Sequence, residues 1–159
     1  MKHLMVIVLA TFLLVSVAPQ PAQSGVGAFL TWWDAEDMDT GFGGGLKYEF
    51  PLIPIVSIDA RVSYISFSDV DLYTIPIEAV GTAKLGMFYG GLALGYYIWD
   101  GIDADTSAEI GGSILAGISL GLGSIGAFGE IRYNVVKTRV ADTFDMNADG
   151  FSINLGVHF

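Results

Sequence analysis

Few residues of this chain have the type and position that catalysis requires. His3 lies in an apolar N-terminal segment, so His158, next to the last residue, is the only histidine left to act as a general base. Glu109 and Glu130 are carboxylates suited to acid–base chemistry, but roles in salt bridges explain them with fewer assumptions. We therefore predict that the protein is not an enzyme, has no catalytic residues and needs no cofactor.

A candidate metal site has the spacing of calcium ligands. Asp145, Asn147 and Asp149 follow the pattern that opens an EF-hand loop. The bidentate glutamate that such a loop needs eleven residues after Asp145 is missing, because that position is Gly156. Two interpretations remain, a weak divalent-cation site and an acidic loop that is only solvated. The second is favoured, so no firm metal site is predicted.

Charged residues inside the regular segments of the chain share one side of a two-residue alternation. Five acidic residues lie in segments where apolar residues alternate with small or polar ones, and each of the five falls on the polar side. The basic residues of these segments fall on the same side, with Lys84 near a turn. We predict a polar network on this face that comprises Lys47, Glu49, Asp59, Arg61, Glu78, Glu109, Glu130, Arg132, Asn154 and His158.

Pairing of neighbouring strands predicts which of these residues meet. Opposite charges must lie close together if they are to be held away from water. The expected contacts are Lys47 with Asp59, Arg61 with Glu78, and Glu130 and Arg132 with Asn154 and His158.

Eight alternating segments of about the length of a transmembrane strand position these residues. They cover Gly25–Trp33, Gly41–Phe50, Val56–Phe67, Leu72–Lys84, Phe88–Trp99, Ala108–Leu120, Ile125–Val136 and Gly150–Phe159. The chain is 52% hydrophobic and only 15% charged, with a mean hydropathy of +0.56, which is too apolar for an ordinary soluble domain. We predict an all-β, eight-stranded antiparallel up-and-down transmembrane β-barrel whose lumen holds the charges.

A transmembrane helix over residues 110–129 is the main alternative, because these twenty residues carry no charge. Seven of them are glycines, each of which costs about 1 kcal/mol in a helix relative to alanine. The turn sequence Gly121-Leu-Gly-Ser124 also divides the stretch, so strands are favoured.

Short and long connections alternate along the chain, as they do in outer-membrane barrels. The short ones, Pro51–Pro54, Leu85–Met87 and Gly121–Ser124, are free of charge. Twelve of the 17 acidic residues lie in the long ones, Asp34–Thr40, Ser68–Asp71, Asp100–Thr106 and Lys137–Asp149. Both chain ends then belong to the rim with the short turns, and the net charge of −10 excludes nucleic-acid binding.

Residues 1–24 are predicted to be a secretory signal peptide, and residues 25–159 the barrel domain. Lys2 and His3 precede a short apolar block, and Ala22-Gln-Ser24 offers small residues at the cleavage positions. The chain has no cysteine, so neither a lipoprotein signal nor disulfide bonds are expected.

The whole segment 25–159 resembles the small outer-membrane β-barrel family that includes the OmpA transmembrane domain and OmpX. The most specific resemblance is the last strand, which ends at phenylalanine. The resemblance implies that this strand is read by the barrel assembly machinery through Phe151, Ile153, Leu155, Val157 and Phe159. It also implies export through the Sec pathway to the outer membrane of a Gram-negative bacterium.

Two functions are compatible with such a chain. Six aromatic residues join the charges on the lumen side, so we expect a filled lumen and a structural or surface-interaction role for a monomer with acidic extracellular loops. The alternative is a narrow gated channel or transporter for small solutes. Expected partners are outer-membrane lipid, lipopolysaccharide and divalent cations at the loops. The six aromatic residues are Phe29, Trp33, Tyr89, Tyr97, Trp99 and Phe128.

Overall fold

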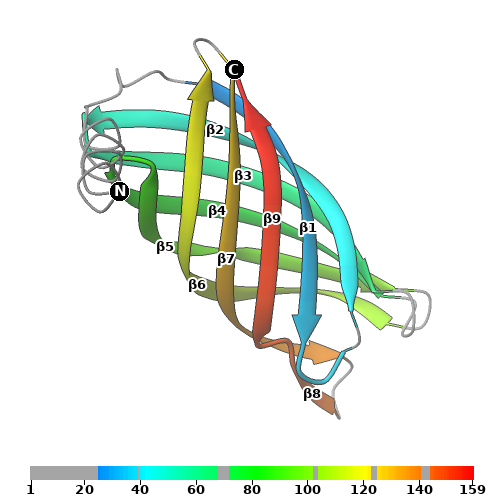
Figure 1. Ribbon diagram of the computed structural model, residues 1–159. Coiled ribbons are helices and arrows are strands. Elements are labelled where there is room, and N and C mark those ends of the chain that lie inside the picture. The colour runs from blue at the N-terminus through cyan, green and yellow to red at the C-terminus, as the bar shows by residue number, and fades with distance from the viewer. Residues whose placement is uncertain (1–24, 39, 68–71, 102–103, 123–124, 141–143) are drawn as a thin grey trace, which may run out of the picture.

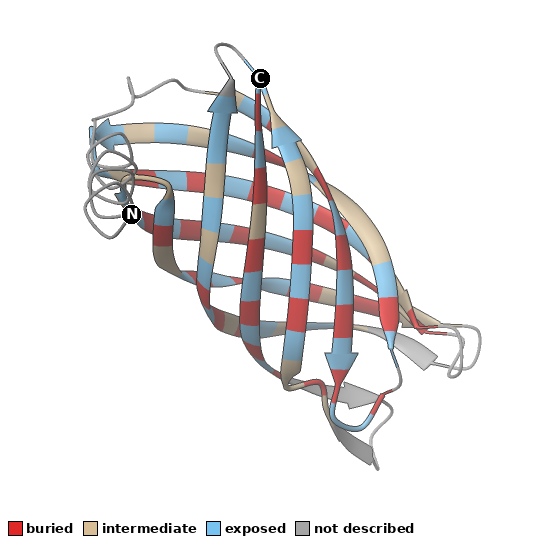
Figure 2. Cartoon of the chain, viewed as in Figure 1, coloured by how far each residue is buried: buried red, intermediate tan, exposed pale blue. Residues whose placement is uncertain are grey.

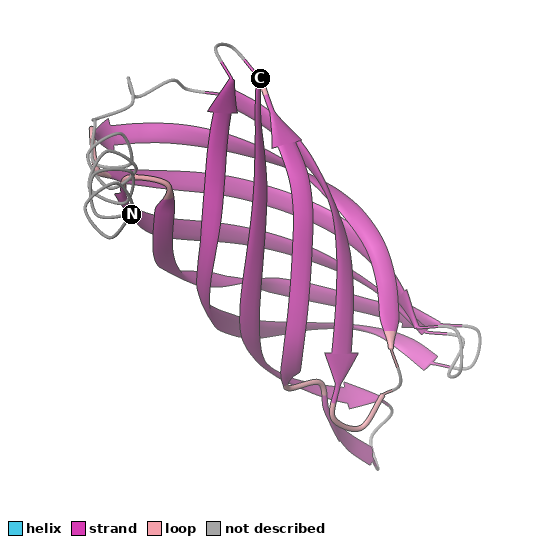
Figure 3. Cartoon of the chain, viewed as in Figure 1, coloured by secondary structure: helices cyan, strands magenta, loops and turns pink. Residues whose placement is uncertain are grey.

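The computed structural model describes residues 25–38, 40–67, 72–101, 104–122, 125–140 and 144–159, and the predicted signal peptide lies outside these ranges. Figure 3 shows strands and loops only in this part of the chain. No helix among these residues is long and apolar enough to cross a membrane. The strands are β1 (Gly25–Ala35), β2 (Gly41–Ile53), β3 (Val56–Phe67), β4 (Leu72–Leu85), β5 (Phe88–Gly101), β6 (Ala104–Leu122), β7 (Ile125–Val140), β8 (Phe144–Asn147) and β9 (Gly150–His158).

Eight of these strands form a closed antiparallel barrel. Strands β1 to β7 each pair with the next in sequence, β7 pairs with β9, and β9 pairs with β1 to close the sheet. The short strand β8 pairs only with the end of β7 and stands outside the closed sheet (Figure 1). The prediction of an eight-stranded up-and-down barrel is therefore confirmed.

The strand register determines how wide this barrel is. A path of paired residues that leaves β1 at Gly25 returns to β1 at Ala35, a stagger of ten residues. With standard strand spacing, eight strands and this stagger give a tilt of about 41° and a radius of about 8 Å. Such a cylinder is filled by its own side chains. The path runs Gly25, Glu49, Asp59, Val80, Ala93, Ser113, Asn134, Gly150, Ala35.

Burial alternates along the strands of the closed barrel wherever their side chains are described, as the banding in Figure 2 shows. The apolar side chains expected on the outer face are exposed, and all six aromatic residues expected in the lumen are buried. The exposed set includes Leu46, Tyr48, Phe50, Ile58, Val62, Tyr64, Leu92, Leu94, Tyr96, Ile131 and Tyr133.

The structure departs from the sequence prediction mainly beyond the rim of the barrel. The segment Lys137–Asp149 was expected to be a loop, but β7 continues to Val140 and forms a hairpin with β8. Lys137-Thr138-Arg139-Val140 keeps strand-forming residues past the membrane-sized part of β7, which gives β8 an edge to pair with.

Pro76 lies inside β4, where a proline usually requires a bulge or the end of pairing. Instead, the register between β3 and β4 is the same on both sides of it, and pairing with β3 is only interrupted. Proline lacks the N–H that this ladder would use, whereas its pairing with Tyr97 of β5 is kept.

Candidate functional site: the polar lumen and its lid

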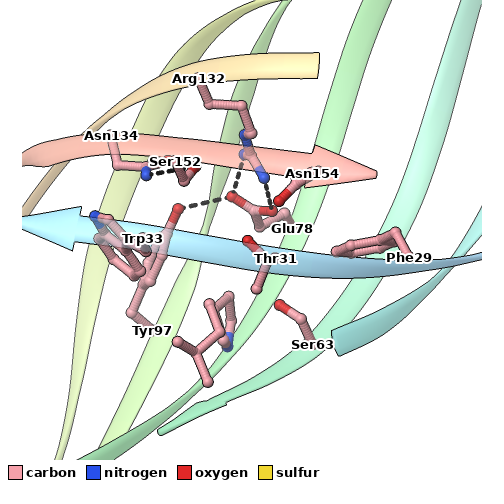
Figure 4. Close-up of a pocket in the computed structure, with 12 residues that line it drawn as sticks. Phe29, Thr31, Trp33, Ser63, Glu78, Tyr97, Arg132, Asn134, Ser152 and Asn154 are labelled. Carbon is pink, nitrogen blue, oxygen red and sulfur yellow. Dashed lines mark hydrogen bonds and ion pairs between the residues drawn. The ribbon is translucent and has the colours of Figure 1, made fainter. Parts of the chain in front are cut away.

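The first buried cluster of the lumen is centred on Glu78 of β4. Arg132 of β7 donates to both carboxylate oxygens, from Nη1 to Oε2 at 2.9 Å and from Nη2 to Oε1 at 2.6 Å. The Tyr97 hydroxyl of β5 donates to Oε1 at 2.7 Å, and Arg132 also donates to Ser113 Oγ of β6. Three strands are thus joined at one carboxylate, as the bonds of Arg132 and Tyr97 to Glu78 in Figure 4 show. The fourth strand, β6, is connected to it through Arg132.

The second cluster is centred on Glu130 of β7. Arg61 Nη1 of β3 donates to its Oε1 at 2.5 Å, and the Tyr89 hydroxyl donates to Oε2 at 2.9 Å. Asn154 Nδ2 of β9 donates to Oε1 at 2.8 Å, and Arg61 also donates to Asp59 Oδ2 at 2.7 Å. In the strand order of the barrel, β3 and β7 are four positions apart in either direction. Arg61 and Glu130 therefore cross the full width of the lumen.

The network becomes more accessible toward the rim that carries the short turns, here called the turn rim. Lys47 Nζ lies 3.9 Å from Asp59 Oδ2 and 3.8 Å from Glu49 Oε2, and Lys84 pairs with Glu49. The side chain of Lys84 is 35% exposed and that of Glu49 is 13% exposed, against 1% for Arg61. Bulk solvent can thus reach the turn-rim end of the lumen, whereas the side chains at its centre are shielded from it.

These ion pairs explain how a narrow lumen holds charge. A buried ion that loses its partner destabilises a protein by about 3–5 kcal/mol, because its lost hydration is no longer compensated. Asp59, Glu78 and Glu130 each contact an arginine, and Glu49 contacts two lysines. The four acidic and four basic side chains of these pairs balance.

The opposite rim, where the long loops lie, is closed by an apolar cluster that we call the lid, formed by Trp33, Met38, Phe67, Trp99 and Ala148. Its three aromatic ring centroids lie 5.7 to 6.1 Å apart. Met38 and Ala148 come from the connections beyond the strands, and both are fully buried. Described parts of two of the long loops, at Met38 and Ala148, therefore pack against the aromatic rings at the mouth of the barrel.

Two of the three candidate cation residues, Asn147 and Asp149, make hydrogen bonds within and between these loops. Asn147 Oδ1 accepts the Asp149 N–H, and Asp149 Oδ1 accepts the Val136 N–H at 2.8 Å. Asn147 also donates from Nδ2 to Glu36 Oε2 at 2.8 Å. The side chain of Asp145 lies outside the described set. Among the described residues, no group of three acidic or histidine side chains is placed to hold a metal ion.

Two residues of the predicted network stand apart from it. Glu109 is half-buried and makes no ion pair with a described side chain. His158 stacks on Phe128 with ring centroids 6.4 Å apart, and its Nδ1 has no hydrogen-bond partner within the described chain. Arg61 is the register neighbour of Glu78, as expected, yet it bonds to Glu130 instead.

Sequence reasoning placed Trp33 and Trp99 in the lumen but missed the polar roles of Tyr89 and Tyr97 and the part of the lid that comes from the loops. Both tyrosines were expected in the lumen as aromatic filling, and their hydroxyls gave no further signal. Met38 and Ala148 lie in segments without alternation, so nothing in the pattern marked them as buried.

The last strand lies with its odd-numbered residues outward. Phe151, Ile153, Leu155, Val157 and Phe159 are all exposed on the outer face. The backbone N–H of Phe159 donates to the Val26 carbonyl, and the Val26 N–H donates to the Phe159 carbonyl, so pairing with β1 reaches the last residue.

The fold and the lumen together define a class of structure, a small closed antiparallel barrel with an apolar exterior and a polar interior filled by side chains. No protein-family model and no curated protein matches the chain. Among solved structures it is similar to the crystal structure of Neisserial surface protein A (NspA). The TM-score is 0.61 at 16% sequence identity, over 84% of this chain and 93% of that chain. At this identity the likeness shows the fold alone.

Proposed function

We propose that this chain is an outer-membrane protein with a structural or surface-interaction role and a lumen that does not conduct. The observation that carries the proposal is a closed barrel with an apolar belt outside and a lid over its filled lumen. A barrel of the same fold occurs in a surface protein, which is the precedent for the role proposed here. The absence of catalysis is part of the proposal.

The dimensions of the belt support residence in a membrane. On β6 the outward residues from Ile110 to Leu120 are apolar or glycine. Eleven residues at the tilt derived above span about 27 Å, close to the apolar band of outer-membrane barrels. A belt of this height on a soluble protein would be an exposed apolar surface of unusual size.

The remaining partners follow from this location. Residues 1–24 would direct export through the Sec pathway, and the exposed odd-numbered residues of β9 would be read by the barrel assembly machinery. The acidic loops would face outward from the cell, toward lipopolysaccharide and divalent cations. Their exposed acidic residues at the rim opposite the turn rim include Asp34, Glu36 and Asp37. The barrel would act as a monomer.

Two measurements test the main proposal. Membrane fractionation with heat-dependent gel mobility should place the protein in the outer membrane, with a folded band that migrates faster than the heated one. The purified protein in planar bilayers should show no current at any voltage. Location in the inner membrane would contradict the membrane assignment, and steady single-channel steps would contradict the non-conducting role.

A second candidate function is a narrow gated channel, because the polar side chains run from the turn rim to the underside of the lid. Trp33 belongs to the lid and also lines the polar cavity beneath it. For a channel gated at the lid, Trp33→Ala should produce voltage-dependent current, whereas Tyr48→Ala on the outer face should not. A silent Trp33→Ala barrel that remains folded would exclude such a channel.

A further inference from the structure

A small polar cavity lies inside the barrel between the lid and the ion pairs. Its wall includes Thr31 of β1, Ser63 of β3 and Asn154 of β9, next to Glu78 and Arg132. Figure 4 shows the two hydroxyls and the amide directed into the same space beside Glu78. The cavity has room for about one water molecule.

One wall atom is a buried acceptor without a partner. Asn154 is 1% exposed, and its Nδ2 donates to Glu130 Oε1 at 2.8 Å. Because an ionised carboxylate only accepts hydrogen bonds, the amide nitrogen must face Glu130. The amide oxygen therefore faces away from Glu130, and it has no hydrogen-bond partner among the described residues. Such an atom destabilises the folded protein unless something donates to it.

The other polar groups of the wall select a neutral occupant. Arg132 repels a cation and Glu78 repels an anion, and the two already pair with each other. The hydroxyls of Thr31 and Ser63 can each donate and accept. An occupant of this size must therefore donate to Asn154 Oδ1 and exchange hydrogen bonds with hydroxyls, which matches the two to four partners of a buried water.

We propose that the cavity is a binding site for one ordered water molecule, held by Asn154 Oδ1 and by the hydroxyls of Thr31 and Ser63. Thr31 and Asn154 are register partners across the β1–β9 seam where the barrel closes. The water would join β1, β3 and β9 and so connect the first strand to the network around Glu130. This site does not depend on the membrane role proposed above.

The chain offers a matched pair of substitutions for a test. Thr31→Val and Thr74→Val each replace a buried threonine hydroxyl by a methyl group of the same shape. Thr74 Oγ1 has no partner in the described chain, and Thr74 does not line the cavity. With the water present, Thr31→Val should raise the unfolding equilibrium constant about fivefold, the typical cost of one hydrogen bond. Thr74→Val should leave that constant unchanged or lower it.

The direct measurement is a high-resolution crystal structure of the purified protein in detergent. A single peak within hydrogen-bond distance of Asn154 Oδ1 and at least one of the two hydroxyls is the expected result. Cavity density that is flat, or a peak at the short coordination distances of a cation, would overturn the proposal. A Thr31→Val protein as stable as the Thr74→Val protein would also overturn it.

Discussion

Substitution of Arg132 should be one of the most destabilising single changes to the barrel, because it leaves the buried carboxylate of Glu78 without its ionic partner. In the Arg132→Met protein, Glu78 keeps only the hydrogen bond from Tyr97, with its side chain 3% exposed. An uncompensated buried charge costs about 3–5 kcal/mol, a large part of the 5–15 kcal/mol that stabilises a typical domain. Glu78→Gln likewise leaves the buried guanidinium of Arg132 without its carboxylate partner. Its cost in unfolding free energy should be smaller, because Ser113 Oγ accepts from Arg132 and Glu130 lies nearby.

The double variant Glu78→Gln/Arg132→Met should be more stable than the Arg132→Met protein. It buries no unpaired charge, and the Tyr97 hydroxyl can still donate to the amide oxygen of the new glutamine. Its expected cost is about 2 kcal/mol, against about 4 kcal/mol for Arg132→Met alone. The control is Lys84→Met, which removes a cation whose side chain is 35% exposed and should cost less than about 1 kcal/mol.

The assay is urea unfolding in lipid vesicles, followed by tryptophan fluorescence and by the heat-dependent gel shift. Unfolding free energies of the unsubstituted protein, of Arg132→Met, of Glu78→Gln and of the double variant give the coupling energy between positions 78 and 132. If Arg132→Met costs no more than Lys84→Met, or if the single effects simply add in the double variant, the lumen is hydrated and the reasoning from burial is wrong.

Three further predictions concern the lid, the outer face and one turn. Trp33→Ala should lower the unfolding free energy by about 3–5 kcal/mol, because it removes the ring against which Met38 packs. Trp32→Ala on the outer face should cost less. Equal unfolding free energies for the two variants would contradict the packing of the lid. Ile114→Arg, in the middle of β6, should lower the unfolding free energy in vesicles by about 2–4 kcal/mol, against about 0–1 kcal/mol for Leu85→Arg at the turn rim. If the two substitutions cost the same, the outer face is not a membrane belt. Gly86 has φ of 63° in the two-residue turn between Leu85 and Phe88, so Gly86→Ala should cost about 1–2 kcal/mol. Gly81→Ala is its control, because a Cβ there meets open space, and a cost as large as that of Gly86→Ala would refute the turn argument.

The faces of the strands were predictable because period-two alternation is a local property. Lys47, Glu49, Asp59 and Arg61 share one phase, and any pairing that keeps the apolar phase outward sends all four to the lumen. Burial of the six lumen aromatic residues follows for the same reason. None of this required knowledge of how far one strand is shifted against the next.

Partner choice inside the lumen was not predictable to the same extent. Arg61 and Glu78 are neighbours in the ladder, which made them an obvious pair. The side chain of Arg61 nevertheless extends across the lumen and bonds to Glu130, whereas Glu78 pairs with Arg132. Which side chains meet across the lumen depends on the stagger of the whole sheet, and no single segment of the sequence encodes that stagger.

The narrowness of the barrel connects these observations. With a radius of about 8 Å, opposite strands are close enough for one arginine and one glutamate to meet across the axis, as Arg61 and Glu130 do. In a wider barrel the same residues would face water, and their pairing would add little to stability. Because the barrel has so few strands, its charged side chains can form ion pairs that connect strands on opposite sides of the lumen. It also leaves an interior in which one unpartnered amide oxygen, that of Asn154, is enough to define a site for a single water molecule.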